Sequence, residues 1–289
     1  MTDRFIAVDW GTSNRREYLM EDGRVLATSR DNRGIIEMGG AGYEEAVAAI
    51  RAAHGDLPVL IAGMAGSNRG WREAAYADAP ATAQDIAAQL LWVEPGRTAI
   101  VPGVAWRDPA APSVMRGEEV QLFGAVAAGL TPPTALVAQP GTHNKWVEMK
   151  DGAIGRFTTL MTGELFALLK DHSILSAQLG GEIMPGPAFL EGVRDARSRP
   201  LTSALFGARA SVLLGYRASE DMADYVSGLL IGADVGSAEV AGREAFILSD
   251  GALGGLYRAA VAELGGVAHL VDTVTAFTAG MALIRSLSK

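Results

Sequence analysis

Short apolar runs alternate with helical patterns along most of the chain. Residues 4–8 and 58–63 are apolar, and the second run, PVLIAG, is typical of a strand buried on both faces. Between these runs, residues 43–53 carry apolar side chains at helical spacing. The Asp22-Gly23 pair separates two β-prone segments and predicts a hairpin. The first part of the chain therefore predicts an α/β architecture.

The same order of elements recurs in the second half. The sequences VDWGTS and AQPGTHNK each join an apolar strand to a second strand through a glycine-bearing turn, which is compatible with a duplicated fold. Asp151-Gly152 predicts a second hairpin. The other expected elements are helices at 84–93, 119–128, 162–169, 203–213, 222–235, 253–264 and 276–287, and strands at 98–101, 134–138 and 245–248.

A segment rich in proline and alanine predicts a division of the chain. The 289 residues are enough for one large domain or two modest ones, and we favour two. Residues 106–113 contain RDPAAP, which is typical of a linker. We therefore expect an N-terminal domain over residues 1–110 and a C-terminal domain over residues 111–289, with sheets in both.

Composition narrows the classes of partner and compartment. Twenty-five Lys and Arg against 33 Asp and Glu give a net charge of −8, which disfavours nucleic acid and anionic membranes as partners. The absence of cysteine excludes disulfides, thiolate zinc sites and cysteine nucleophiles. The apolar run before Asp9 is too short for a signal peptide, so we expect a cytoplasmic protein. The sequence leaves a homodimer open.

Two glycine turns carry groups that could bind phosphate. Residues 9–13 (DWGTS) follow the first strand, where glycine permits close approach and hydroxyls can donate to phosphate oxygens, and Asp9 could hold a hydrated metal ion. Residues 140–145 (PGTHNK) repeat this design with imidazole, amide and ammonium donors. Each turn alone is equally compatible with an ordinary hairpin. Together they favour a polyphosphate ligand.

Further polar and small residues lie at the starts of helices and the ends of strands. Glu118 and Glu119 begin an apolar helix, where they either complement the helix dipole or supply a general base beside Arg116. The loop 62–71 follows the buried PVLIAG strand, and its Ser67, Asn68 and Arg69 are candidate contacts to a small molecule.

Small residues in two other stretches could border a flat ring or could serve packing alone. These stretches are 228–234 and 248–255. Thr162-Gly163-Glu164 has the ordinary composition of a helix N-terminus, and we favour capping over catalysis for Glu164. The scattered histidines have no partner at metal-ligand spacing, so no zinc site is expected.

Taken in order, the motifs DWGTS, GMAGSNRGW, MRGEE, PGTHNKW and MTGELFALL resemble the 2-dehydro-3-deoxygalactonokinase family. This family belongs to the sugar kinase, chaperone ATPase and actin superfamily. The resemblance spans nearly the whole chain, and PGTHNKW with MTGELF is its most specific part. It implies an α/β fold of two ribonuclease-H-like lobes, with the active site in the cleft between them. The N-terminal lobe would bind the sugar acid and the C-terminal lobe would bind adenosine.

The resemblance also implies a role for each motif. The first phosphate loop would comprise Asp9, Gly11, Thr12 and Ser13, with Asp9 near Mg²⁺, and the second would comprise Gly141, Thr142, His143 and Lys145. The adenosine site would involve Gly232, Ala233 and Gly251. The general base would be Glu118 or Glu119, where many relatives have aspartate, and Arg69 or Arg116 would bind the substrate carboxylate. Ser13-Asn14-Arg15-Arg16 stands where many relatives have Thr-Asn followed by Leu-Arg, which leaves the role of Arg16 open.

The implied reaction is phosphoryl transfer from ATP to the 6-hydroxyl of 2-dehydro-3-deoxy-D-galactonate, a step of galactonate catabolism. Two alternatives stay open. One is a kinase for the epimer 2-dehydro-3-deoxygluconate, because pocket contacts distinguish epimers by only a few kcal/mol. The other is an ATP-binding protein of the actin class without catalysis.

Overall fold

The computed structural model describes residues 2–289 and divides the chain into two compact units. Unit 1 comprises the chain up to Thr134, Glu148–Thr158 and Asp272–Lys289, and unit 2 comprises Ala135–Val147 and Thr159–Val271. The boundary expected near residue 110 lies inside unit 1, and the division of ligand binding at that position stays a prediction. Among residues 2–289, no helix combines the length and the apolar character needed to span a bilayer.

Unit 1 is built on a six-stranded sheet and a smaller three-stranded sheet. The six strands, in spatial order, are β3 (Arg24–Asp31), β2 (Arg15–Glu21), β1 (Arg4–Trp10), β4 (Val59–Gly63), β7 (Thr98–Ile100) and β6 (Leu91–Glu94). The smaller sheet contains β5 (Tyr76–Asp78), β8 (Gly103–Trp106) and β9 (Ser113–Met115). The helices are α1 (Ile35–Met38), α2 (Tyr43–His54), the 3₁₀ turn η1 (Met64–Gly66), α3 (Ala83–Ala88), α4 (Glu118–Ala127) and α10 (Thr273–Leu287).

The buried run PVLIAG forms the centre of the six-stranded sheet. β4 is buried at every position and pairs in parallel with both β1 and β7. A strand covered on both faces needs apolar side chains throughout, which explains its lack of alternation. Helix α2 buries Tyr43, Ala46, Val47 and Ile50, the spacing of one helical face.

Two sequence predictions in unit 1 were wrong. The helix expected over 84–93 ends at Ala88, and β6 follows because Leu91 and Trp92 pair with β7. Residues 106–113, expected to be a linker, instead run from the end of β8 to the start of its antiparallel partner β9. Strand pairing overrode the local signals in both places.

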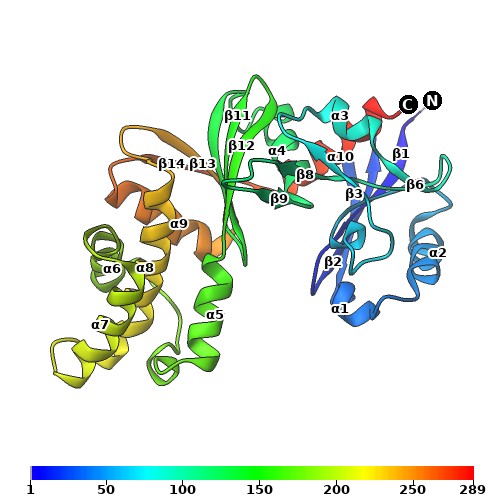
Figure 1. Cartoon of the computed structure of the whole chain (residues 1–289). Helices are drawn as coiled ribbons and strands as arrows, with labels where there is room; N and C mark the ends of the chain where they lie inside the picture. Colours follow the sequence, from blue (N-terminus) through cyan, green and yellow to red (C-terminus); the bar gives the residue numbers. More distant parts are fainter. Residues whose placement is uncertain (1) are drawn as a thin grey trace. The chain divides into compact units, whose positions relative to one another are not determined.

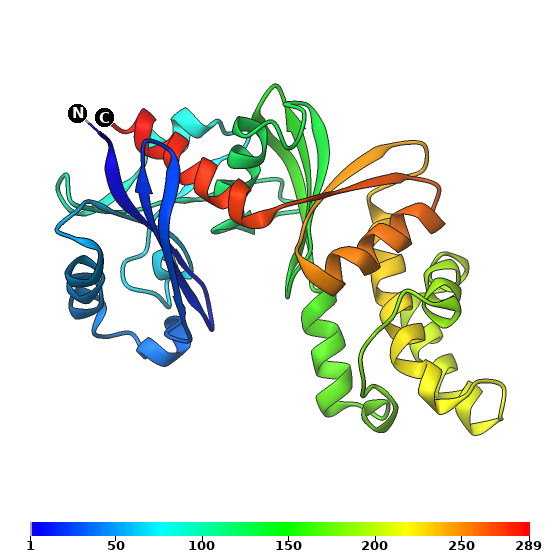
Figure 2. The ribbon, with the colours of Figure 1, turned by 180° about the vertical axis from the view of Figure 1, so that it is seen from behind.

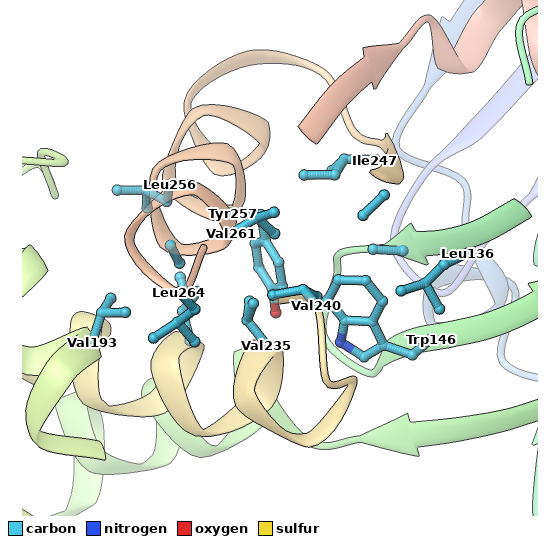
Figure 3. Close-up of a cluster of buried hydrophobic side chains, with 14 of the residues drawn as sticks. Leu136, Trp146, Val193, Val235, Val240, Ile247, Leu256, Tyr257, Val261 and Leu264 are labelled. Carbon is cyan, nitrogen blue, oxygen red and sulfur yellow. The ribbon is translucent and has the colours of Figure 1, made fainter. Parts of the chain in front are cut away.

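Unit 2 contains a five-stranded sheet with helices packed beside it (Figure 1). Its order is β12 (Ala153–Leu160), β11 (Asn144–Lys150), β10 (Ala135–Gln139), β13 (Glu244–Leu248) and β14 (Val267–Val271), of which residues 148–158 cluster with unit 1. The helices are α5 (Thr162–His172), α6 (Pro187–Ser198), α7 (Leu201–Leu213), α8 (Met222–Ser237) and α9 (Gly251–Glu263), with 3₁₀ turns η2 (Ser176–Gln178) and η3 (Ser219–Asp221). The core cluster around Leu136, Trp146 and Tyr257 joins the sheet to α8 and α9 (Figure 3).

The two large sheets share one topology. The spatial order β3-β2-β1-β4-β7 in unit 1 corresponds, strand for strand, to β12-β11-β10-β13-β14 in unit 2. The hairpins also use the same turn chemistry, because Asp22-Gly23 and Asp151-Gly152 all have positive φ angles between 48° and 80°. The predicted α/β fold with a ribonuclease-H-like sheet in each half is confirmed.

Helices α4 and α10 of unit 1 cross at a glycine contact. A Cβ atom on Gly124 would lie 1.8 Å from the carbonyl oxygen of Ala276, and one on Gly280 would lie 1.9 Å from that of Val120. Figure 2 shows α10 returning to the side of β1, so that the two chain ends lie together, and Lys289 Nζ lies 2.9 Å from Asp3 Oδ2. This crossing fixes α4, whose first residue is Glu118.

Replacing Gly124 with Ala should destabilise the protein by about 2–3 kcal/mol, because the new methyl group must push α10 away from α4. Urea unfolding measures this loss. The matched control is Gly255→Ala in α9, where no atom lies within 4 Å of the added Cβ. The control should gain roughly 0.5–1 kcal/mol from the lower entropy of the unfolded chain. Equal urea midpoints for Gly124→Ala and wild type would show that the crossing carries no close contact.

Candidate functional site

Three backbone segments of unit 1 approach one another at Gly63. Gly63 has a φ of +95°, and a Cβ atom there would lie 2.8 Å from the carbonyl oxygen of Trp10. On the other side, a Cβ atom on Gly117 would lie 3.0 Å from the Gly63 Cα. Glycine at both positions therefore permits the end of β1, the end of β4 and the start of α4 to meet. Candidate residues from three predicted motifs come together here.

The first predicted phosphate loop lies at the carboxyl end of β1. Its backbone is fixed by the Gly11 N–H, which donates to Asn14 O at 2.9 Å, and by Gly11 O and Thr12 O, which accept from amides of α1. The side chains of Thr12 and Ser13 remain exposed. The Gly11 N–H and the carbonyl groups of Gly11 and Thr12 are thus used within the fold, and the loop offers the exposed hydroxyls of Thr12 and Ser13 as donors.

Asp9 lies at the end of β1 with charged neighbours. Burial raises the pKa of its carboxyl group, the Arg16 guanidinium opposes this rise, and the negative charge of Glu118 adds to it. The Arg16 Nη1 to Asp9 Oδ2 distance is 3.8 Å. A half-buried carboxylate near a second carboxylate is favourable for a cation. Mg²⁺ takes one or two carboxylates and completes its shell with water and phosphate oxygens, so Asp9 fits such a role.

The two glutamates at the start of α4 occupy different environments. Glu118 is half-buried, and its Oε2 accepts the Arg116 N–H at 2.8 Å. Glu119 is fully buried, and both its oxygens accept the Gly117 N–H, at 2.9 and 2.8 Å. Burial, followed by the charge of Glu118, raises the pKa of Glu119 to about 8. Of the two glutamates, Glu118 is the one whose charge acts on the pKa of Asp9.

The loop after β4 is compact and places Arg116 beneath it. The Ser67 hydroxyl donates to Met64 O at 2.7 Å and so closes the loop, while Asn68 and Arg69 are exposed. Arg116 is 9% exposed, and its guanidinium lies over the Tyr76 ring, 4.3 Å from the centroid.

Arg116 keeps unused hydrogen-bonding capacity. Its Nη2 donates to Ala74 O at 2.7 Å, whereas Nε and Nη1 are buried without a hydrogen-bond partner. Nη1 would lie 3.0 Å from a Cβ atom on Gly66, so a glycine in this loop leaves room for the guanidinium. Unpaired buried N–H groups are costly, and an anion that reached them would offset that cost.

The second predicted phosphate loop, in unit 2, is seated on the start of α5. A Cβ atom on Gly163 would lie 2.5 Å from Gly141 O, and the Glu164 N–H donates to Thr142 O at 3.0 Å. Thr142 and His143 are exposed, and His143 Nε2 lies 2.5 Å from Glu164 Oε2. Glu164 thus orients His143, a contact that its expected capping role does not include.

Lys145 differs from its predicted neighbours. The side chain is 5% exposed, and its ammonium donates to His143 O at 3.1 Å. It supports the loop from within, so its predicted contact with phosphate stays a prediction.

A pocket of about 310 Å³ opens beside this loop in unit 2. Its volume falls within the range of small-molecule pockets, roughly 300–1,000 Å³. The walls come from the second phosphate loop and from α5, α8 and α9. The lining residues are Gly141, Thr142, Thr162, Gly163, Phe166, Ile183, Ser227, Leu230, Ile231, Leu253, Leu256 and Tyr257. Mostly apolar walls beside the predicted phosphate loop are of the kind that suits a flat base and its sugar.

The residues predicted to border adenosine lie next to this pocket but do not line it. A Cβ atom on Gly232 would lie 2.6 Å from the Val193 Cα, so this glycine lets α8 pack closely on α6. Ala233 is half-buried on the same helix, and Gly251 is exposed at the start of α9. The adjacent Leu230, Ile231 and Leu253 line the pocket instead.

Sequence reasoning missed several of the residues in these clusters. The ring of Tyr76 packs against the Arg116 guanidinium, and Phe166 and Tyr257 line the pocket. A lone aromatic residue in an apolar sequence pattern does not indicate such a role. Phe166 lies in the MTGELF motif, and this motif is the sequence feature that could have indicated its role. Among residues 2–289, no group of three or more His, Cys, Asp or Glu forms a complete metal cage.

Comparisons with known proteins agree on one family. Residues 9–284 match the family model described as 2-keto-3-deoxy-galactonokinase. A protein of Rhizobium meliloti (strain 1021), named as a probable 2-dehydro-3-deoxygalactonokinase, is 40% identical over 295 residues, covering 96% of this chain and 95% of the relative. The 2-dehydro-3-deoxygalactonokinase of Escherichia coli (strain K12) is 37% identical over 294 residues, covering 100% of this chain and 98% of the relative.

Solved structures show the same fold. A Sinorhizobium meliloti protein described as a candidate 2-dehydro-3-deoxygalactonokinase superposes with a TM-score of 0.89 at 36% identity, covering 98% of both chains. Component A of (R)-2-hydroxyglutaryl-CoA dehydratase from Acidaminococcus fermentans has a TM-score of 0.52 at 12% identity, covering 99% of both chains. The latter likeness concerns the fold alone.

Replacing Glu119 with Gln should change how stability depends on pH. Burial raises the pKa of Glu119 to about 8 in the folded state, whereas the ordinary value for a glutamate is 4.5. Between these values the free energy of unfolding of wild type falls as pH rises, by at most about 1.4 kcal/mol per pH unit. Glu119→Gln removes this contribution, so its stability relative to wild type should increase with pH across that window.

Urea unfolding at about pH 5.5 and about pH 7.5 measures this effect. The control is Glu73→Gln, because Glu73 is exposed. A stability difference between Glu119→Gln and wild type that is the same at both pH values would contradict the raised pKa.

Proposed function

The chain belongs to the 2-keto-3-deoxy-galactonokinase family, and from this premise we propose that it transfers the γ-phosphoryl group of ATP to the 6-hydroxyl of 2-dehydro-3-deoxy-D-galactonate. The products are ADP and 2-dehydro-3-deoxy-6-phosphogalactonate. The observation that carries the proposal is the close approach at Gly63, which brings Asp9 of β1 and Glu118 of α4 near enough for the charge of Glu118 to raise the pKa of Asp9. Carboxylates there suit metal binding and proton acceptance, the two tasks that phosphoryl transfer to an alcohol requires.

Glu118 is the proposed general base. In the transfer, the sugar-acid oxygen forms a bond to the γ-phosphorus, the bond from that phosphorus to the β,γ-bridging oxygen breaks, and Glu118 accepts the hydroxyl proton. The Arg116 N–H donates to one oxygen of Glu118 and so helps to fix the position of the carboxylate. Glu119 is an unsuitable base because it is fully buried and occupied by the Gly117 N–H.

The phosphate donors come from both predicted loops. Thr12 and Ser13 in unit 1, and Thr142 and His143 in unit 2, present exposed donors. Asp9 would hold Mg²⁺, which when bound with ATP neutralises charge on the phosphate oxygens. The pocket beside Thr142 would take the adenosine, and its apolar side chains suit the faces of the base. The net charge of −8 makes such local donors necessary for an anionic substrate.

Arg116 is the stronger of the two candidates for the substrate carboxylate. Its guanidinium is held in place by Tyr76 and Ala74 O and retains two unpaired N–H groups. A planar guanidinium matches a carboxylate with two parallel hydrogen bonds. Arg69 is exposed and has no such support. We therefore assign the substrate carboxylate to Arg116, and Asn68 and Arg69 would contact the substrate at the exposed edge of the site.

A homodimer and a cytoplasmic location complete the proposal. Helix α7 and the turn after it expose Phe206, Leu213, Leu214 and Tyr216 by 65–81%. Large apolar side chains gathered on one element are typical of an interaction surface, which supports self-association. The cytoplasm is where ATP and a sugar acid awaiting breakdown would both be present.

A coupled assay of ADP release over a small panel of acceptors tests the proposed activity. We expect turnover with 2-dehydro-3-deoxy-D-galactonate, less with the C4 epimer, and little with neutral hexoses, because only the acids carry the carboxylate for Arg116. Faster turnover with the gluconate epimer would reassign the substrate. No acceptor-dependent ADP release with any acid would leave an ATP-binding protein without kinase activity.

Replacing Glu118 with Gln should lower kcat by roughly 10²-fold or more, because the amide cannot accept the hydroxyl proton. The side chain keeps its size, so the dissociation constant of ADP should change little. Glu119→Gln is the matched control and should keep turnover within about tenfold of wild type. The opposite pattern, with Glu118→Gln active and Glu119→Gln dead, would move the base by one residue.

A further inference from the structure

A single buried carboxylate of α8 gathers four hydrogen-bond donors in unit 2. Asp234 is 1% exposed, and its Oδ1 accepts from Asn144 Nδ2 and from Trp146 Nε1, each at 2.7 Å. Its Oδ2 accepts from the Tyr257 hydroxyl at 2.8 Å and from the Thr162 hydroxyl. The donors lie 23 to 90 residues away in the sequence. This carboxylate therefore joins strand β11, helix α5 and helix α9 to α8.

The donors belong to the surfaces that surround the pocket. Thr162 and Tyr257 are themselves lining residues, and Asn144 directly follows His143 in the second phosphate loop. The rings of Trp146 and Tyr257 pack in one core cluster, as Figure 3 shows. Asp234 does not line the pocket. Any effect that it has on a ligand there must pass through the groups it holds.

The loop and α5 have only short links of their own. The Glu164 N–H donates to Thr142 O, and Gly163 lies against Gly141 O. Asp234 adds a second link between the loop and α5, because Asn144 at the end of the loop and Thr162 at the start of α5 donate to the same carboxylate. A shared acceptor couples the positions of both donors.

We propose that Asp234 is a positioning residue for nucleotide binding. It holds the second phosphate loop, the start of α5 and the wall formed by α9 in the arrangement that accepts ATP and ADP. This inference rests on the proposed function insofar as the pocket is assigned to the nucleotide. It goes further by assigning a role to a buried residue that touches neither ATP nor the sugar acid.

The chemistry of the cluster explains why a carboxylate is needed. Four donors converge on two oxygens, and only a carboxylate offers acceptors on both sides without a hydrogen of its own. Burial raises the pKa of Asp234, while the hydrogen bonds from Thr162, Trp146, Tyr257 and Asn144 lower it. An amide at this position offers an acceptor on one side only. The Trp146 N–H can only donate, so the new NH₂ group would face Thr162 and Tyr257, whose hydroxyls would have to change from donors to acceptors.

The test is Asp234→Asn, with ADP binding measured by titration calorimetry and steady-state constants measured for both substrates. The dissociation constant of ADP and the KM for ATP should each rise about tenfold or more, as expected when a buried donor to a charged group loses its partner. The KM for the sugar acid should stay within about threefold, because the proposed acid site lies among residues of unit 1. If Asp234 had a purely structural role, Asp234→Asn would change the KM for ATP and the KM for the sugar acid by similar factors.

Asp195→Asn is the matched control. Asp195 of α6 accepts from the Tyr225 hydroxyl at 2.6 Å and from Arg199 Nη2 at 2.8 Å, and none of these three residues lines the pocket. The control should lower the thermal midpoint and leave the dissociation constant of ADP within about twofold of wild type. If it weakens ADP binding as much as Asp234→Asn does, the effect is general loosening of unit 2, and the proposal is wrong.

Asn144→Ala keeps the inference testable if Asp234→Asn does not fold. It removes the link from the loop to Asp234 and leaves the carboxylate with three donors, so it should also weaken ADP binding. An unchanged ADP dissociation constant in the folded variant would overturn the proposal. Wild type that binds ADP yet phosphorylates none of the acids would refute the proposed kinase activity, whereas weaker ADP binding by these variants would still support the role of Asp234.

Discussion

The close approach of three backbones at Gly63 is the constraint on which unit 1 depends. A side chain at this residue would strike Trp10 O, and one at Gly117 would press on Gly63 itself. A side chain at either glycine would force these backbone segments apart. The electrostatic interaction between Asp9 and Glu118, which raises the pKa of Asp9, exists only because these two ends meet. The site is thus fixed by backbone sterics first and by charge second.

In unit 2 the predicted phosphate loop is held by hydrogen bonds as well as by a glycine contact. The glycine contact lies between Gly163 and Gly141, and a buried carboxylate supplies the additional hold. Hydrogen bonds to Asp234 are directional, whereas a glycine contact only limits how near two segments can come. The pocket walls are apolar, and their hydroxyl groups on Thr162 and Tyr257 donate to Asp234. The result is a mostly apolar pocket beside a loop with exposed polar side chains, which is the arrangement that the proposed nucleotide site requires.

Local sequence patterns were sufficient for much of the fold and for part of the site. The buried strand of PVLIAG, the two Asp-Gly hairpins and the glycine turns all follow from chemistry within a few residues. The sequence left the choice between Glu118 and Glu119 open, and the structure buries Glu119 on the same face of α4 as Leu122 and Phe123. What no local pattern contains is the meeting of distant segments. Tertiary packing brings Tyr76 to Arg116, α10 to Gly124 and the four donors to Asp234. It also explains why a strand forms at Leu91, where the sequence predicted the end of a helix.

The shared topology of the two sheets makes their chemical difference informative. Asp9-Trp10-Gly11-Thr12 ends β1, and Gln139-Pro140-Gly141-Thr142 ends β10, so glycine and threonine keep the same offset while an acid is replaced by an amide. A carboxylate suits a bound cation, whereas an amide beside a phosphate loop adds no negative charge to repel the polyphosphate. An acid in both loops would add a further negative charge to a chain that already has a net charge of −8. The carboxylates lie in unit 1, whereas the loop in unit 2 presents the Thr142 hydroxyl and the His143 imidazole, which is the division of charge that the proposed reaction of a polyanion with an alcohol requires.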